Sequence, residues 1–158
     1  MRFRIAPALL PSWLLGWLLA LASCAAGTYQ RAPIPPQDVE VSSSSVSRIY
    51  LLRMREAKGF YRSVRVEDNE REIGRIGNDS FLCWERPPAR ALLTLEVEPV
   101  ELAGGKSSEL FVDVQCEPGK AYYYAISVDA AWNRPRVRQL EATEARELLE
   151  GLTLPPVE

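Results

Sequence analysis

The sequence predicts a mainly β protein: a small antiparallel β-sandwich or open barrel followed by one short C-terminal helix. Three observations lead to this fold class. Seven or eight short runs of β-branched, aromatic and aliphatic residues lie between residues 46 and 140. Turn-forming residues separate these runs every 8–12 residues, and the apolar period becomes helical only after residue 141.

The first half of this domain is predicted to hold four strands, over residues 48–53, 60–66, 72–76 and 81–84. Asp68-Asn69 is a turn signal between the second and third strands, and Gly77-Asn78-Asp79 closes the third. Pro87-Pro88 ends the fourth strand, since proline cannot donate to a β-ladder.

The second half is predicted to hold the remaining strands, over residues 91–98, 110–116, 121–128 and 136–140. The clearest of them is 91–98, where apolar side chains alternate with Thr94, Glu96 and Glu98 among others. Gly104-Gly105 marks one loop tip and Pro118-Gly119 a tight turn.

A two-turn helix is expected over residues 144–149. Thr143 is a plausible N-cap, and Glu144 is favourable near the positive end of the helix dipole. Gly151 is placed to stop the helix.

The first 23 residues have the order of a bacterial export signal. Arg2 and Arg4 supply positive charge, and residues 5–22 are apolar except for Ser12. The segment Leu21-Ala22-Ser23-Cys24 resembles the lipobox of bacterial lipoproteins. This resemblance implies cleavage before Cys24, a diacylglycerol on its sulfur, and anchoring in a lipid bilayer. Ala25, where an aspartate favours inner-membrane retention, implies the outer membrane, with the domain facing the periplasm.

Two other interpretations of the leader stay open. An uncleaved transmembrane helix needs about 20 apolar residues in a row, and Pro7, Pro11 and Gly16 interrupt this shorter run. An ordinary secretory cut is compatible with Ala20-Leu21-Ala22, but it leaves Cys24 without a purpose.

The domain organisation follows from these segments. Residues 1–23 are the expected lipoprotein signal peptide, and residues 24–45 form a lipidated N-terminus and a Pro/Ser-rich tether. Residues 46–151 are the predicted β-sandwich, and 152–158 a C-terminal tail.

Several short motifs carry a family resemblance. They are Val64-x-Val66, Asp68-Asn69, Ile73-Gly74-x-Ile76, Ser80-Phe81-Leu82-x-Trp84, Pro87-Pro88 and Glu117-Pro118-Gly119-Lys120-Ala121-Tyr122-Tyr123. Together they resemble a family of uncharacterised bacterial lipoprotein domains, similar in turn to PEGA-type surface domains. The resemblance spans residues 47–151 and implies an immunoglobulin- or transthyretin-like sandwich. The family has no established enzymatic mechanism or catalytic residues that could be assigned to this chain. The family has Pro-Gly where this chain has Pro88-Ala89.

Composition argues against several function classes. The chain contains no histidine, which removes the commonest general base and zinc ligand. Without the two signal arginines, 17 basic side chains face 21 acidic ones, so the mature chain is acidic and no nucleic-acid partner is expected. No catalytic residue, metal or cofactor is predicted.

Cys83 and Cys116 are a candidate disulfide, because an oxidising compartment favours pairing of the two cysteines left after lipidation. The alternative is that each is a small buried apolar side chain in its strand.

Aromatic residues suggest a binding surface. Trp132 lies in the expected loop 130–135 and is a candidate partner contact, the alternative being that it packs over a sheet edge. Tyr122, Tyr123 and Tyr124 alternate in direction, so most of this run is expected in the core. The carboxylates of Asp68, Glu70, Glu72 and Asp79 fit no calcium loop and are expected on a solvated hairpin.

These observations favour a non-enzymatic envelope lipoprotein whose β-sandwich is an interaction or structural module for an envelope protein partner. A binding module for cell-wall glycan or a small ligand is the alternative, and an enzyme with an unrecognised carboxylate or lysine site is a third.

Overall fold

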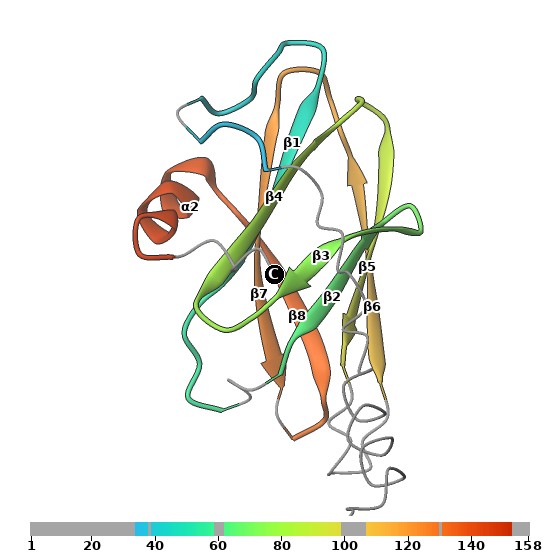
Figure 1. Ribbon diagram of the computed structural model, residues 1–158, viewed down its shortest axis with the longest axis vertical. Coiled ribbons are helices and arrows are strands. Elements are labelled where there is room, and N and C mark those ends of the chain that lie inside the picture. The colour runs from blue at the N-terminus through green and yellow to red at the C-terminus, as the bar shows by residue number, and fades with distance from the viewer. Residues whose placement is uncertain (1–33, 38, 59–61, 99–106, 130, 153–158) are drawn as a thin grey trace, which may run out of the picture.

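The chain folds into a β-sandwich of two four-stranded sheets with one helix packed outside, which confirms the predicted fold class (Figure 1). The computed structural model describes residues 34–37, 39–58, 62–98, 107–129 and 131–152. Within them the strands are β1 (Ser47–Arg53), β2 (Val64–Asp68), β3 (Arg71–Ile76), β4 (Ser80–Arg86), β5 (Arg90–Val97), β6 (Ser108–Gln115), β7 (Ala121–Asp129) and β8 (Arg134–Leu140). Helix α2 (Ala142–Leu149) follows the last strand.

The two sheets differ in how their strands pair. Sheet A has the strand order β4-β1-β7-β8, and sheet B has the order β3-β2-β5-β6. All neighbours are antiparallel except β1 and β7, which run parallel with Ile49 opposite Tyr122. Strand β1 therefore lies inside sheet A although it comes first in the chain.

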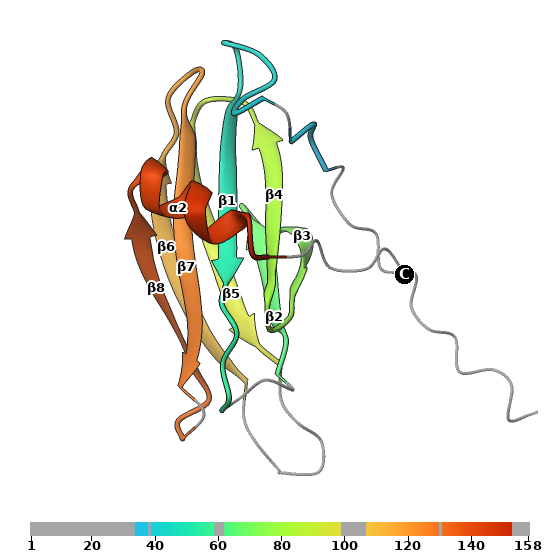
Figure 2. The same cartoon turned by 90° about the vertical axis from the view of Figure 1, so that its left-hand side faces the viewer.

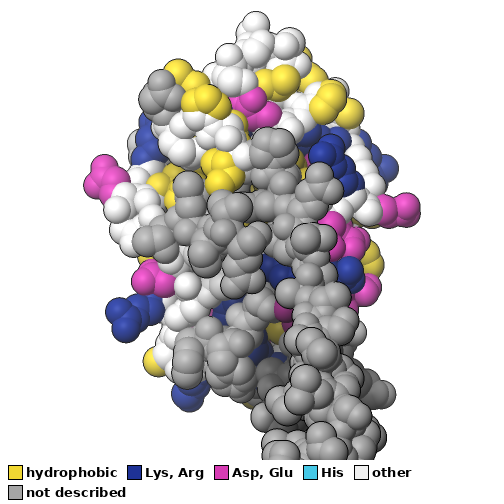
Figure 3. All heavy atoms as spheres, viewed as in Figure 1, with side chains coloured by type: hydrophobic (Ala, Val, Ile, Leu, Met, Phe, Trp, Pro, Cys, Tyr) yellow, Lys and Arg dark blue, Asp and Glu magenta, His cyan; other side chains and the backbone are white. Residues whose placement is uncertain are grey.

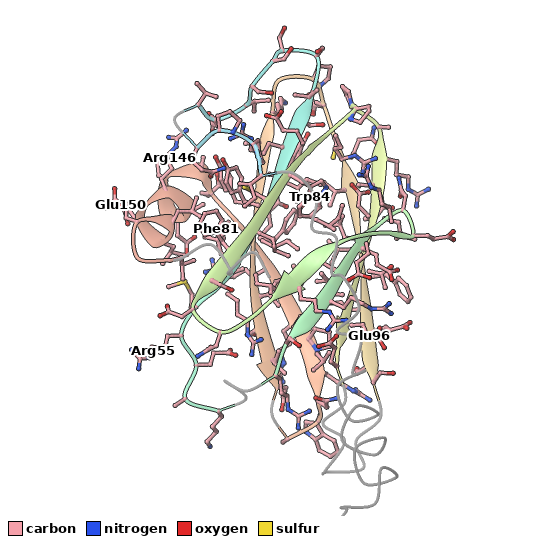
Figure 4. The ribbon with its side chains drawn as sticks, in the orientation of Figure 1. Arg55, Phe81, Trp84, Glu96, Arg146 and Glu150 are labelled. Carbon is pink, nitrogen blue, oxygen red and sulfur yellow. The ribbon has the colours of Figure 1, made fainter. Side chains whose placement is uncertain are left out.

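The main core lies between the sheets and follows the predicted alternation. On β5, Ala91, Leu93, Leu95 and Val97 are fully buried, as the strict period of this strand predicts. The same core receives side chains from sheet A, including Trp84. In Figure 4, Trp84 lies on the side of β4 away from the helix.

Sheet A is covered on its other face as well. Helix α2 lies across β7 and β1 in the side view (Figure 2), and Ala145 is fully buried beneath it. A second apolar cluster forms there, which we call the outer cluster; its buried members are Tyr50, Leu52, Phe81, Cys83, Tyr123, Leu140, Ala145 and Leu152. Because both faces are covered, every residue of β1 is buried.

The start of the helix differs from the prediction. The N-cap residue is Glu141, and no side chain caps the helix, so the expected N-cap Thr143 lies inside the first turn. The helix begins early because Ala142 already packs against the outer cluster, and the amide of Ala145 donates to the carbonyl of Glu141 at 2.9 Å.

Candidate functional site

A buried arginine fixes the segment that precedes β1. Arg48 is fully buried, and its Nη1 donates to the carbonyls of Pro36 and Val39 at 2.8 and 2.7 Å and to the Tyr50 hydroxyl at 3.0 Å. Its Nη2 lies 2.7 Å from Glu85 Oε1 on the neighbouring strand β4. The guanidinium thus ties Pro36 and Val39 to sheet A, since each carbonyl would otherwise need another donor.

The charges of this pair are held in place by their surroundings. Burial alone would lower the pKa of Arg48, but hydrogen bonds with Tyr50 and Glu85 outweigh it and raise that pKa. Burial would raise the pKa of Glu85, yet the amide and hydroxyl of Ser42 together with Arg48 lower it. Both groups therefore stay charged at neutral pH.

These contacts correct the predicted tether. Residues 34–45 were expected to be a spacer outside the domain, and the structure instead packs this part against sheet A. Ser42 bonds to Glu85, and Ile34 packs on the outer cluster. The proline and serine content of this segment indicated a linker. Composition does not reveal that Arg48 donates hydrogen bonds to the carbonyls of Pro36 and Val39. The rest of the predicted tether lies outside the described residues.

Two stacked tyrosines of sheet A lie beneath a pair of charged side chains, Glu40 and Arg146. The rings of Tyr50 and Tyr123, on neighbouring strands β1 and β7, lie 4.9 Å apart and nearly parallel. The Tyr123 hydroxyl donates to Glu40 Oε1 at 2.9 Å, and Arg146 of α2 lies 2.9 Å from the same oxygen. Burial, followed by the bond to Glu40, raises the Tyr123 pKa well above its usual value.

The same residues surround a surface hollow of about 420 Å³. Its walls come from the segment before β1, the outer face of sheet A and the end of α2; the lining residues are Gln37, Val39, Glu40, Tyr50, Phe81, Tyr123, Arg146, Leu149 and Glu150. In Figure 4, Arg146 and Glu150 lie along α2, and Phe81 lies on the side of β4 that faces the helix. An apolar floor with a few polar groups at its edge is typical of small-ligand sites.

Trp132 lies between β7 and β8 and is presented to solvent. Its side chain is 73% exposed, so the alternative that it packs over a sheet edge is wrong. Asp129 Oδ1 accepts from the amides of Ala131 and Trp132 at 3.1 and 3.3 Å, and Arg136 lies 2.6 Å from Asp129 Oδ2. The turn is therefore held by its own hydrogen bonds and not by the indole.

The candidate disulfide is not formed. Cys83 belongs to the outer cluster, whereas Cys116 belongs to the core between the sheets. The two side chains therefore lie on opposite sides of sheet A and do not pair with each other. Burial raises the pKa of Cys116, as expected for the alternative interpretation of a small buried side chain.

The carboxylates of the β2–β3 hairpin are not all solvated as expected. Asp68 is almost fully buried, and its Oδ2 accepts from the Trp84 indole at 2.9 Å while Arg86 Nη1 lies 2.6 Å from its Oδ1. Asp68 thus provides the hydrogen-bond acceptor for the indole N–H of Trp84, which would otherwise be buried without a partner. The role of Asp68 is therefore structural. Tyr123 and Tyr124 are buried in different clusters, which confirms that this tyrosine run is mostly core.

Within the described residues, no group of three or more acidic or cysteine side chains is placed to hold a metal ion. No helix among them is long and apolar enough to span a bilayer. Cys24 lies outside the described residues. Figure 3 shows acidic and basic side chains interspersed on the described part of one face.

Comparisons with known proteins leave the family open. No family model, curated protein or solved structure matches this chain. The resemblance to lipoprotein and PEGA-type domains therefore stays a prediction.

Sequence reasoning missed Glu40, Arg48 and Arg146, which lie far apart in the chain. One signal was available for the second of these: Arg48 stands within a run of strand residues that is otherwise apolar up to Arg53. A charged side chain in a strand buried on both faces needs a partner, and here that partner is Glu85. Nothing in the local sequence marks Glu40 or Arg146.

Proposed function

We propose that this chain is a lipid-anchored envelope protein whose β-sandwich is a non-enzymatic interaction module. The lipobox ending at Cys24 supports the anchor, and the exposed Trp132 supports the interaction. Large aromatic side chains are enriched at the centres of protein interfaces, where burial of the ring contributes much of the affinity.

The observation that carries the interaction is the way Trp132 is held. The turn bonds through Asp129 need no contact from the indole, so the ring is available for a partner. The backbone amides of Ala131 and Trp132 are already hydrogen-bonded, so burying the ring against a partner requires little further ordering of these two residues. An indole that was only structural would pack against its own sheet, as Trp84 does.

Site-specific photo-crosslinking in living cells tests this function. A photoreactive residue at position 132 is expected to give a discrete crosslinked envelope protein. The matched control is position 111, because Phe111 is also apolar and 58% exposed but lies on the outer face of sheet B. Equal crosslinking from both positions, or none from either, contradicts the proposal.

The anchor is tested separately by Cys24→Ser. The variant is expected to leave the membrane fraction and to change mobility, since the acyl chains are absent. Retention in the membrane with unchanged mobility contradicts lipidation.

A second candidate function, binding of a small ligand, is favoured by the hollow beside α2. Such a site needs a concave surface with an aromatic floor and convergent polar groups, and the hollow has both. The two functions use different surfaces, so their tests are independent.

A further inference from the structure

We infer that the hollow between Gln37, Val39 and Glu40, sheet A and α2 binds a small primary amine that carries an apolar body. This inference rests on the second candidate function and names its ligand class. Three properties of the hollow lead to it: an apolar floor, an excess of negative charge at the edge, and a size that suits a small molecule.

The floor is suited to an apolar body. Phe81, Tyr50 and Tyr123 lie on three neighbouring strands of sheet A, and each is at most 7% exposed. Val39 and Leu149 add aliphatic walls, and Val39 is 42% exposed although its carbonyl is bound to Arg48. A ligand that covers Val39 removes apolar surface from water. The backbone of Val39 is already held by Arg48, so the ligand does not have to order it.

The charges at the edge favour a cation. Among the described residues that line the hollow, three side chains are charged, and two of them, Glu40 and Glu150, are acidic. The one basic group, Arg146, lies 2.9 Å from Glu40 Oε1, which offsets its charge. Among the described side chains Glu150 forms no ion pair, and it is exposed, so its carboxylate is available to an ammonium group.

The helix adds negative potential at the same edge. Leu149 is the last residue of α2 and Glu150 its C-cap, and both line the hollow. The carbonyl end of a helix carries partial negative charge and favours cations. A carboxylate ligand would meet this helix end and two glutamates, with Arg146 already engaged.

The dimensions favour a small free molecule. A volume of about 420 Å³ lies in the range of small-molecule sites. A lysine side chain of another protein would supply an ammonium group but only a thin aliphatic stem, which covers less of the floor formed by Phe81 and the two tyrosines. The occupant that fits both the floor and the edge is therefore an amine with an aromatic or branched apolar body.

The test uses the mature, lipidated chain in detergent and four probes, with binding followed by backbone amide chemical shifts. The probes are 2-phenylethylamine, its neutral analogue 2-phenylethanol, its anionic analogue 3-phenylpropionate, and N-acetyl-lysine amide. We expect 2-phenylethylamine to bind most tightly and to shift the amides of Gln37, Glu40 and Glu150.

Two variants locate the contacts. Glu150→Gln is expected to weaken amine binding about threefold, as for loss of one exposed ion pair, and to leave 2-phenylethanol binding unchanged. Val39→Ser is expected to weaken both of these probes, because the apolar wall is reduced. Glu147→Gln is the matched control, since Glu147 is exposed on α2 but does not line the hollow.

Each contrary result has its own meaning. Equal affinity for the amine, the alcohol and the carboxylate would keep a small-ligand hollow but overturn its preference for amines. Tighter binding of N-acetyl-lysine amide would overturn the free-molecule occupant in favour of a protein side chain. Absence of binding by all four probes would overturn both the amine site and the small-ligand function, and would leave the Trp132 crosslinking test unaffected.

Discussion

Arg48 on β1 and Glu85 on β4 form an ion pair across neighbouring strands, with Nη2 and Oε1 2.7 Å apart. The pair joins the folded domain to the segment before it, because Arg48 also holds the carbonyls of Pro36 and Val39 while Glu85 holds Ser42. Breaking it therefore affects both stability and the position of residues 36–42.

Arg48→Met is expected to lower the free energy of unfolding by about 3 kcal/mol. This loss is at the lower end of the range for breaking a buried ion pair, because Glu85 is partly exposed and water can replace some of its contacts. Denaturant unfolding measures the loss. Hydrogen exchange of the amides of residues 39–46 should also become faster. Arg90→Gln is the control, since the Arg90–Asp113 pair is exposed and its loss should cost much less than that of the buried pair. Equal effects of the two substitutions would contradict the anchoring role of Arg48.

Glu85 gives the stability a pH dependence at the acidic end. The folded-state pKa of Glu85 lies below the ordinary value of 4.5, so its contribution is fully present above that value and is lost as the pH falls through the folded-state pKa. The stability difference between the wild type and Glu85→Gln should therefore shrink as the pH is lowered from 7 to 3. Denaturant midpoints at several pH values check this. A difference that stays constant over this pH range would show that the Glu85 charge is not stabilised by folding.

The two tryptophans of the mature chain should respond in opposite ways to truncation. Trp132→Ala should change the free energy of unfolding by less than about 0.5 kcal/mol, because the ring is exposed. Trp84→Ala should cost about 3–5 kcal/mol, because it opens a cavity and leaves Asp68 without its indole donor. Fluorescence of the remaining tryptophan, with chemical unfolding, measures both. A large stability loss from Trp132→Ala would mean that the ring supports the fold and is not kept for a partner.

The two buried cysteines should behave independently. Because Cys83 and Cys116 lie on opposite sides of sheet A, a reducing agent is expected to leave the unfolding midpoint unchanged. The free-energy losses of Cys83→Ala and Cys116→Ala should add in the double variant. A free energy of unfolding that falls on reduction, by the few kcal/mol that a disulfide contributes, would contradict the structure.

The fold could be predicted from the sequence because period-2 patterns and turn residues are local signals. Strand β5 shows this best, since each of its buried residues follows from the alternation between Ala91 and Val97. The pattern of β4 shows the limit of this reasoning. Phe81 and Cys83 face the outer cluster, whereas Leu82 and Trp84 face the core between the sheets. Because all four residues are apolar, their sequence does not indicate which of the two clusters each one faces.

The candidate site could be predicted only in part. Trp132 was identifiable because a large aromatic residue stands in a turn-rich segment. The hollow was not, because Glu40 and Arg146 are 106 positions apart and meet only when the chain doubles back over sheet A. The composition of residues 34–45 predicted a linker and not a part of the site, because a proline- and serine-rich stretch is typical of a linker.

The docking of residues 34–46 onto sheet A also limits how far the sandwich can reach. If Cys24 is the anchor, as proposed, only the ten residues from 24 to 33 lie between the lipid and the docked segment. A fully extended chain of that length spans about 35 Å. The segment that begins at Ile34 would then lie no more than about 35 Å from the bilayer surface, so the anchor would hold the start of the described domain near the membrane.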